Sequence, residues 1–271
     1  MAIKIGLTMA PMYGTYPKMR EQWLAAEALG VDSLYSADHF FAHGIGKEYA
    51  GDEVRPGATS GTNFEGTTIQ TAMAASTTRP EIGCMVHAIG FRNPNLLADI
   101  ARTIDHVSNG RYILGLGSGY MQGDYEEYGY DWGTTKSRLE DLQRGLPVIK
   151  RRLELLNPPP LHKIPIMIGS TGEKVGMRIV AEHADIWHVF GPMDYIAGKI
   201  EVMKRHCSDI GRDFDDLELC SWYFPHLLDV EQDPDDFVKL GIRNIINMQY
   251  GPEWDLGMVR ELLQWRTNRE G

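Results

Sequence analysis

An acidic residue and a histidine stand next to each other at Asp38 and His39, within the stretch SADHF. A histidine beside a carboxylate can act as a general acid or base, because imidazole exchanges a proton near neutral pH. The same pair could equally be a loop segment that caps a strand or faces water. His43 adds a metal alternative, since histidines four residues apart match a helical zinc pair. Gly44 and Gly46 disfavour a helix there and no third ligand is evident, so we expect no metal.

A second candidate is the turn that follows the apolar run IPIMIG. Gly169 is followed by Ser170 and Glu173, and S-x-x-E is the pattern of a capping box that starts a helix. Free backbone amides, the helix dipole and Lys174 would make such a turn a place for an anion. A plain helix cap that binds nothing would have the same sequence.

Three glycines, Gly115, Gly117 and Gly119, end the apolar run RYILGLGSG. A dinucleotide-binding loop needs G-x-G-x-x-G followed at once by a helix. The spacing here is different, and the segment from Tyr120 to Gly133 has no helical periodicity. We therefore interpret the glycines as allowing close packing at the end of a buried strand.

Short apolar runs that read as strands alternate with helical patterns along the chain. The eight predicted strands are Ile3 to Met9, Ser33 to Asp38, Glu81 to Ile89, Tyr112 to Gly119, Ile164 to Ser170, Asp185 to Phe190, Leu217 to Phe224 and Asn244 to Tyr250. Three helical stripes end at Gly30, Gly110 and Gly211, and a final helix spans roughly Leu256 to Trp265.

Eight strand–helix units in 271 residues fit the α/β class and a (β/α)8 barrel in a single domain, residues 1–271. An open doubly wound sheet is the competing arrangement. In a barrel, the active site lies where the strands end, which would bring the candidate residues to one mouth. Two long connections, His39 to Gly66 and Tyr120 to Thr134, leave the same end and are expected to be functional loops.

The composition favours small-molecule partners. Acidic residues exceed basic ones by 37 to 27, and the formal net charge of −10 argues against nucleic acid and anionic membranes. The chain has no run of 18 apolar residues and no signal-peptide pattern, so we expect a cytoplasmic protein. Cys84, Cys207 and Cys220 form neither a C-x-x-C pair nor a zinc knuckle and are expected to be reduced core residues.

Longer segments resemble a known family. They are FRNPNLLADIARTIDHVSNGRYILGLGSGY, the earlier SADHF and NFEGTTIQTAMAASTTRPEIG, and the later IPIMIGSTGEKVGMRIVAEHADIW. Together they are similar to the bacterial luciferase-like flavin and deazaflavin oxidoreductases, from the first strand to about Arg212. Within that superfamily, the segments GYMQGDYEEYGYDWGT and EKVGMRIVAEHADIW resemble most the actinobacterial branch that depends on coenzyme F420.

The resemblance implies a hydride transfer between F420 and a small organic substrate. It places Asp38 and His39 beside the reactive edge of the deazaflavin, with His39 as proton donor or acceptor. Asp38 would orient His39 or bond the ring. The family's strand-three bulge, often a non-proline cis peptide that supports the ring, falls on Met85 and Val86.

Further cofactor contacts follow from the same resemblance. Gly117 and Gly119 would line the end of the fourth strand beneath the ring. The phosphate-binding turn would comprise Gly169, Ser170, Thr171, Gly172, Glu173 and Lys174. The substrate pocket would be shaped by Tyr120, His87 and the loop that begins at Phe40 and ends at Gly66.

Departures from the family pattern bear on the substrate. Sugar-phosphate dehydrogenases of this family have a glutamate where this chain has Tyr120, and their tryptophan after the second strand has no clear match in FFAHGIGKEY. A sugar phosphate is therefore not the expected substrate. Two other functions fit the resemblance: an FMN-dependent monooxygenase that uses oxygen, and a non-catalytic flavin or deazaflavin carrier. Relatives often dimerise, so a homodimer is considered as well.

Overall fold

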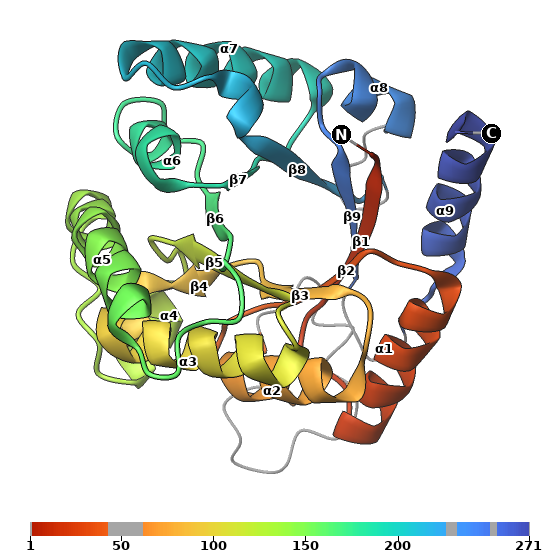
Figure 1. Cartoon of the computed structure of the whole chain (residues 1–271), viewed down its shortest axis with the longest axis horizontal. Helices are drawn as coiled ribbons and strands as arrows, with labels where there is room; N and C mark the ends of the chain where they lie inside the picture. Colours follow the sequence, from red (N-terminus) through yellow and green to blue (C-terminus); the bar gives the residue numbers. More distant parts are fainter. Residues whose placement is uncertain (1, 43–61, 226–231, 250–253, 271) are drawn as a thin grey trace.

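A computed structural model of the chain describes residues 2–42, 62–225, 232–249 and 254–270. Within these ranges, strands alternate with helices from one end of the chain to the other (Figure 1). The strands are β1 (Lys4–Met9), β2 (Ser33–Ser36), β3 (Glu81–Cys84), β4 (His87–Ala88), β5 (Tyr112–Gly117), β6 (Ile166–Gly169), β7 (Ile186–His188), β8 (Glu218–Tyr223) and β9 (Asn244–Gln249). Each predicted strand contains one of these strands, except that Glu81 to Ile89 contains two.

The strands form one closed parallel sheet. Their order is β3-β2-β1-β9-β8-β7-β6-β5-β4, and an additional pairing of β3 with β5 closes the ring. The short strands β3 and β4 share one position, since Ile82 pairs with Tyr112 near the start of β5 and His87 pairs with Leu116 near its end. The sheet is therefore an eight-position barrel, which confirms the predicted (β/α)8 fold and excludes an open sheet.

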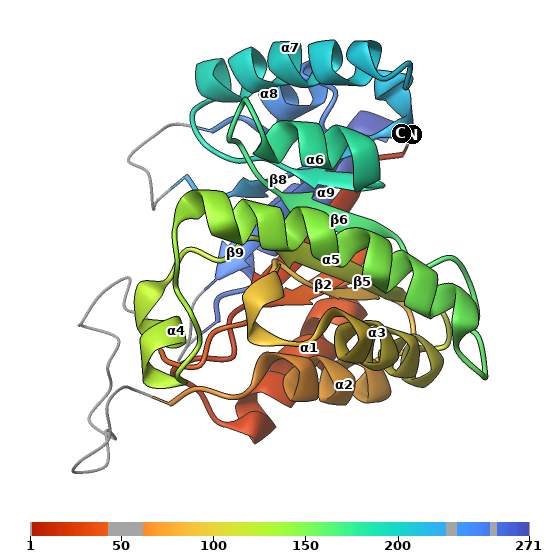
Figure 2. The same cartoon turned by 90° about the vertical axis from the view of Figure 1, so that its left-hand side faces the viewer.

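Helices surround the barrel in chain order, and the short helix α4 (Gln122–Glu127) lies at its open end (Figures 1 and 2). The other α-helices are α1 (Tyr16–Leu29), α2 (Gly66–Ser76), α3 (Pro94–Ser108), α5 (Thr135–Leu155), α6 (Gly176–His183), α7 (Met193–Asp209), α8 (Pro234–Lys239) and α9 (Gly257–Glu270). The chain leaves α1 at Gly30, whose φ of 97° suits a residue without a Cβ, as the sequence predicts. The short helix α4 corrects the expectation that the segment after Tyr120 holds no helix.

Two apolar layers stabilise this arrangement. The larger layer lies between the strands and the surrounding helices, and the smaller one fills the barrel interior with side chains that include Tyr35, Ile113, Met167 and Ile246. Full burial of one such side chain is worth about 1.5–3 kcal/mol. All three cysteines are unpaired and buried, as expected. Among the described residues, no helix is both long and apolar enough to cross a lipid bilayer.

The two ends of the barrel differ in character. At the end where the strands begin, Lys4 lies between Glu81 and Glu218, with its Nζ 3.2 Å from an oxygen of each carboxylate. Lys4 thereby joins β1 to β3 and β8 at this end. The opposite end, where the strands finish, is open.

Candidate active site

A cavity of about 550 Å³ lies at the carboxyl ends of the strands. Almost every strand position contributes residues to its wall. The cavity therefore lies at the end of the barrel where the sequence predicts the active site. The lining residues are Thr8, Ala10, Met12, Ala37, Asp38, His39, Met85, Val86, Ala88, Phe91, Gly119, Tyr120, Met121, Asp124, Gly169, Ser170, Thr171, His188, Phe190, Trp222, Met248 and Gln249. The wall is largely apolar, and none of these described residues is a lysine or an arginine.

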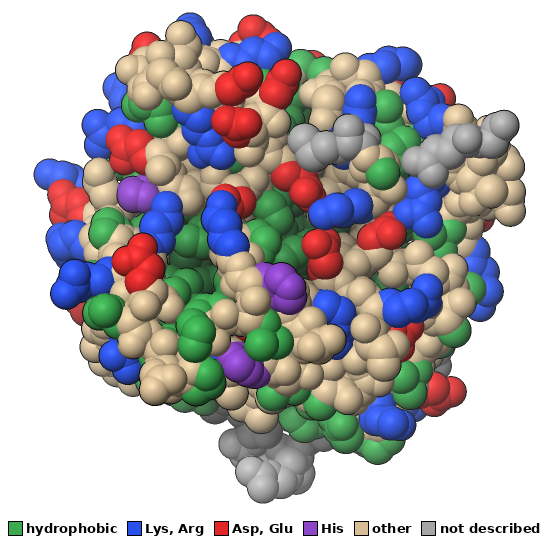
Figure 3. Space-filling view, in the orientation of Figure 1, with side chains coloured by type: hydrophobic (Ala, Val, Ile, Leu, Met, Phe, Trp, Pro, Cys, Tyr) green, Lys and Arg blue, Asp and Glu red, His purple; other side chains and the backbone are tan. Residues whose placement is uncertain are grey.

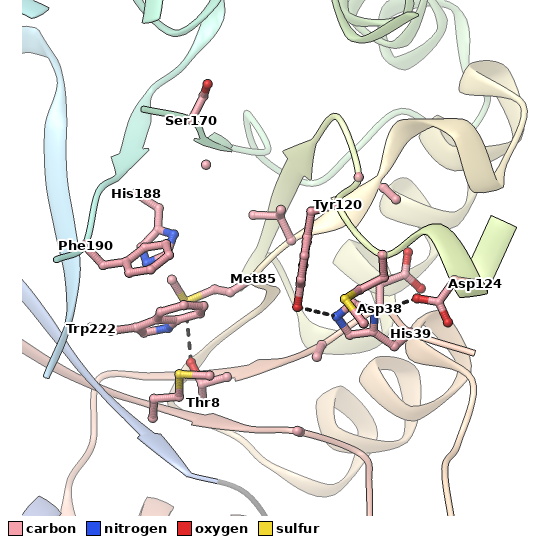
Figure 4. A pocket seen from close by; sticks show the side chains of 18 of the residues that line it. Thr8, Asp38, His39, Met85, Tyr120, Asp124, Ser170, His188, Phe190 and Trp222 are labelled. Carbon is pink, nitrogen blue, oxygen red and sulfur yellow. Dashed lines mark hydrogen bonds and ion pairs between the residues drawn. The ribbon is translucent and has the colours of Figure 1, made fainter. Parts of the chain in front are cut away.

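The break between β3 and β4 forms part of this wall. The peptide bond between Met85 and Val86 is cis, which confirms the non-proline cis bond implied at this site. Both side chains line the cavity although they are neighbours in sequence, and Met85 also accepts a hydrogen bond from Thr8 through its sulfur, at 3.5 Å (Figure 4). The amide of Met85 donates to the carbonyl of Ser36 at 2.9 Å, which ties the bulge to the end of β2.

The glycines of β5 make room for this bulge. A Cβ on Gly115 would lie 1.9 Å from the carbonyl oxygen of Cys84, and one on Gly117 would lie 2.6 Å from Cγ2 of Val86. A Cβ at Gly115 therefore requires the backbone at Cys84 to move, and one at Gly117 requires the Val86 side chain to move. Only Gly119 of the three lines the cavity, so Gly117 supports the wall from behind. The close-packing interpretation of the glycines is confirmed.

His39 is held by two polar groups across the barrel mouth (Figure 4). Its Nδ1 lies 2.7 Å from Oδ2 of Asp124, and its Nε2 lies 3.2 Å from the Tyr120 hydroxyl. The other oxygen of Asp124 accepts a hydrogen bond from the amide of Phe40 at 3.1 Å. The Asp124 side chain is 0% exposed and that of His39 is 14% exposed. Asp124, at the start of α4, thus fixes the imidazole that follows β2.

Asp38 has different partners from those expected. Arg92 donates two hydrogen bonds to its carboxylate, at 2.6 and 2.8 Å, and Nδ1 of His87 lies 3.2 Å from Oδ2. Burial by itself would raise the pKa of the Asp38 carboxyl, but His87 and Arg92 outweigh it and hold that pKa well below its usual range. The expectation that Asp38 orients His39 is corrected, because Asp124 does so.

Arg92, which follows β4, is joined through two carboxylates to both ends of the connection between β2 and α2. Besides Asp38 after β2, it binds Glu65, whose carboxylate caps α2 by accepting from the amides of Thr67 at 3.1 Å and Thr68 at 2.7 Å. Hydrogen bonds from Thr68 and the Arg92 charge outweigh burial and lower the pKa of Glu65 to about 2. The mouth of the barrel around His39 is therefore braced by ionised groups.

The opposite wall of the cavity is aromatic. The His188 ring lies 4.5 Å from that of Trp222 and 5.3 Å from that of Phe190, measured between centroids. Burial lowers the pKa of His188 to about 3, so its imidazole is neutral at physiological pH. Nε2 of His188 and Nε1 of Trp222 are buried, and neither has a hydrogen-bond partner among the described residues.

Two expected substrate contacts lie away from the cavity wall. His87 is fully buried behind it, where its Nε2 lies 3.2 Å from the Tyr112 hydroxyl, which donates to Gln70 at 2.9 Å. Phe40 stacks on Tyr128, with ring centroids 4.0 Å apart. Both expectations are corrected. Most of the loop expected to shape the pocket, residues 43–61 with His43, lies outside the described residues.

The expected phosphate turn is only partly at the cavity. Gly169, Ser170 and Thr171 line it, whereas Gly172, Glu173 and Lys174 do not. Glu173 instead accepts from Lys199 at 2.7 Å, and its carbonyl oxygen lies 2.6 Å from Nε2 of His206. The capping-box interpretation is wrong, because α6 begins only at Gly176 and Ser170 makes no cap.

The sequence alone does not identify Asp124 or Arg92 as residues of the site. Asp124 stands in a segment without apolar periodicity, and its partner is 85 positions away. Arg92 belongs to the FRNP motif that carries the family resemblance, but nothing local reveals its partners.

No group of three histidine, cysteine or carboxylate side chains among the described residues is placed to hold a metal ion. On the face shown in Figure 3, acidic and basic side chains are interspersed.

Known proteins share both sequence and fold with this chain. The family model described as luciferase-like monooxygenase matches residues 2–236. A phthiodiolone/phenolphthiodiolone dimycocerosates ketoreductase of Mycobacterium tuberculosis is 29% identical over 219 residues, which are 72% of this chain and 57% of that protein. An F420-dependent glucose-6-phosphate dehydrogenase of Amycolatopsis mediterranei is 31% identical over 131 residues, 48% of this chain and 35% of the other.

A solved structure shares the fold over nearly the whole chain. An F420-dependent secondary alcohol dehydrogenase in complex with an F420–acetone adduct superposes with a TM-score of 0.76 and 16% identity, and the match covers 96% of this chain and 98% of the other. The matched part of this chain spans a little over half the length of the ketoreductase. Since the family model covers most of the sequence and the barrel carries the expected bulge, the chain belongs to the luciferase-like monooxygenase family.

Proposed function

We propose that this chain is an oxidoreductase that transfers a hydride between coenzyme F420 and a small organic substrate with an alcohol or carbonyl group. The observation that carries the proposal is one cavity lined by two functional features. His39, held by Asp124, and the Met85–Val86 bulge both line it, on neighbouring strand positions. The names of the dehydrogenase relatives, both F420-dependent, support the choice of cofactor.

The cavity fits a flat cofactor with one polar edge. Met85 and Val86 would support one face of the ring system. Buried polar atoms normally have partners, and leaving one without a hydrogen bond costs about 1–3 kcal/mol. The nitrogens of His188 and Trp222 that have no partner in the described part of the chain could bond to the polar edge, and Ser170 and Thr171 would contact the tail.

Bound F420 would supply a ring carbon that gives or takes a hydride, and the chain would manage the rest of the reaction. His39 would hold or release the proton that accompanies the hydride. Asp124 would fix the tautomer of His39 and stabilise its protonated form. The aromatic side chains of Phe190 and Trp222 would exclude water from the substrate.

A parallel titration with F420 and FMN tests the cofactor. We expect F420 to quench the tryptophan fluorescence with a micromolar or lower Kd, and FMN to bind at least about tenfold more weakly, a difference of about 1.4 kcal/mol. Val86→Asp should weaken F420 binding, whereas Val107→Asp, on the exposed side of α3, should not. Tighter binding of FMN would favour the oxygen-using monooxygenase, and no binding of either would refute the proposal.

Assembly is a separate part of the proposal. A homodimer is inferred from the family resemblance alone, and light scattering of the purified chain measures its mass directly. A monomeric mass at micromolar concentration would contradict the homodimer and leave the cofactor assignment untouched.

A further inference from the structure

Both ring nitrogens of His39 are already engaged by protein groups. Nδ1 faces the Asp124 carboxylate at 2.7 Å and Nε2 faces the Tyr120 hydroxyl at 3.2 Å. A carboxylate can only accept a hydrogen bond, so Nδ1 must carry a proton. In the neutral imidazole, Nε2 is then an acceptor, and the Tyr120 hydroxyl is the donor to it. Hydrogen bonds are thus donated in one direction, from Tyr120 to His39 and from His39 to Asp124 (Figure 4).

Exposure increases from Asp124 through His39 to Tyr120. The side chain of Asp124 is 0% exposed, that of His39 is 14% exposed, and Tyr120 is 72% exposed as a residue. The phenol is therefore the member that a substrate in the cavity can reach most directly. The rings of His39 and Tyr120 pack edge to face, with centroids 5.4 Å apart, so the hydroxyl is directed at Nε2 by packing as well as by the hydrogen bond.

The conformation of Gly119 fixes the backbone position of Tyr120. Gly119 has a φ of 82°, which favours glycine, and a Cβ there would lie 2.2 Å from the Tyr125 hydroxyl. The Tyr125 side chain itself is buried and donates to the carbonyl of Ser118 at 3.3 Å. Since Asp124 lies one residue before Tyr125, the same short segment positions both ends of the chain of hydrogen bonds around His39.

We propose that Tyr120 is a catalytic residue that exchanges the proton with the substrate oxygen, and that His39 is the proton store behind it. The inference rests on the proposed function. In alcohol oxidation, the carbinol C–H hydrogen leaves with its electron pair to F420, and the O–H proton passes to the Tyr120 oxygen. Tyr120 passes its own proton to Nε2 of His39, and Asp124 stabilises the resulting imidazolium. Reduction of the carbonyl reverses each transfer.

The first test needs no cofactor. In the free protein with ¹⁵N-labelled histidine, side-chain NMR at pH 8 should show His39 with Nδ1 protonated and Nε2 unprotonated. Tyr120→Phe should shift the Nε2 resonance, because it removes only the hydroxyl. Tyr128→Phe removes a hydroxyl from another exposed tyrosine at this mouth and should leave the resonance unchanged. A protonated Nε2 in the wild type would overturn the inference, because Tyr120 could not pass a proton to it.

The second test measures turnover with acetophenone and reduced F420. Tyr120→Phe should lower kcat at least about 10²-fold, as expected for loss of a general acid, while KM and the F420 Kd change less than about twofold. Tyr128→Phe should match the wild type. An undiminished kcat in Tyr120→Phe would overturn the inference and leave the proposed function standing. Failure of the wild type to bind F420 would refute the proposed function, and the NMR result would still decide the proton path.

Discussion

The pH dependence of stability should reveal the buried imidazole of His188. This side chain lies in the aromatic wall of the cavity. It is 5% exposed, and burial lowers its pKa to about 3. In the unfolded chain it would take up a proton near pH 6.5. Between these two values the unfolded state binds more protons than the folded state, so the free energy of unfolding falls as the pH falls.

The size of this effect follows from the two pKa values. Between pH 7 and pH 5 the unfolded imidazole becomes almost fully protonated while the folded one stays neutral. Proton linkage then removes about 2 kcal/mol from the free energy of unfolding over this interval. For a protein whose total stability is about 5–15 kcal/mol, such a loss is easily measured.

Urea unfolding of the wild type and of His188→Phe at pH 7 and pH 5 isolates the contribution of His188 to the free energy of unfolding. The wild type should lose about 2 kcal/mol more than the variant between the two pH values, because every other group titrates in both proteins. His162→Phe, at an exposed position, is the matched control and should retain the wild-type difference. Equal losses in the wild type and His188→Phe would show that the folded protein solvates or hydrogen-bonds this imidazole.

Three further substitutions test the supporting structure by thermal and urea unfolding. Gly115→Ala places a Cβ against the Cys84 carbonyl and should cost at least about 2–3 kcal/mol; a smaller loss would show that the bulge yields easily. Arg92→Met leaves the buried Asp38 carboxylate without its bidentate partner and should cost about 3–5 kcal/mol, which an Asp38→Asn second substitution should partly restore. Arg111→Met removes donors to three carbonyls at and after the end of α2, and should lower the free energy of unfolding by roughly 2–3 kcal/mol. An unchanged free energy of unfolding would show that Arg111 does not stabilise this segment.

The barrel was predictable because its signals are local. Apolar runs of strand length, glycine stops and helical periodicity recur along the chain, and each reports its own element. The position of His39 followed from the same logic, since a residue after a barrel strand lies at the mouth. The resemblance added the Met85–Val86 bulge, which no propensity would reveal.

The partners of the site residues were not predictable in the same way. Asp124 reaches His39 only because the short helix α4 folds back over the end of β2, and that placement depends on the whole barrel. The placement of His87 in the pocket depends on which way its side chain leaves the strand. Met85 and Val86 both line the cavity, so the alternation of a regular strand fails at the bulge and gives no direction for His87.

The fit between β5 and the bulge also restricts how this barrel can diverge. Residues 115 and 117 can gain a side chain only if the segment at Cys84 and Val86 retreats, and the bulge can form only where those positions stay empty. Neither change is tolerable by itself, so the two segments, some 30 residues apart in the sequence, are expected to be inherited as a unit. Family members that have a regular strand in place of the bulge should carry larger residues at both glycine positions. Such paired replacements would identify members that no longer bind a flat-ring ligand.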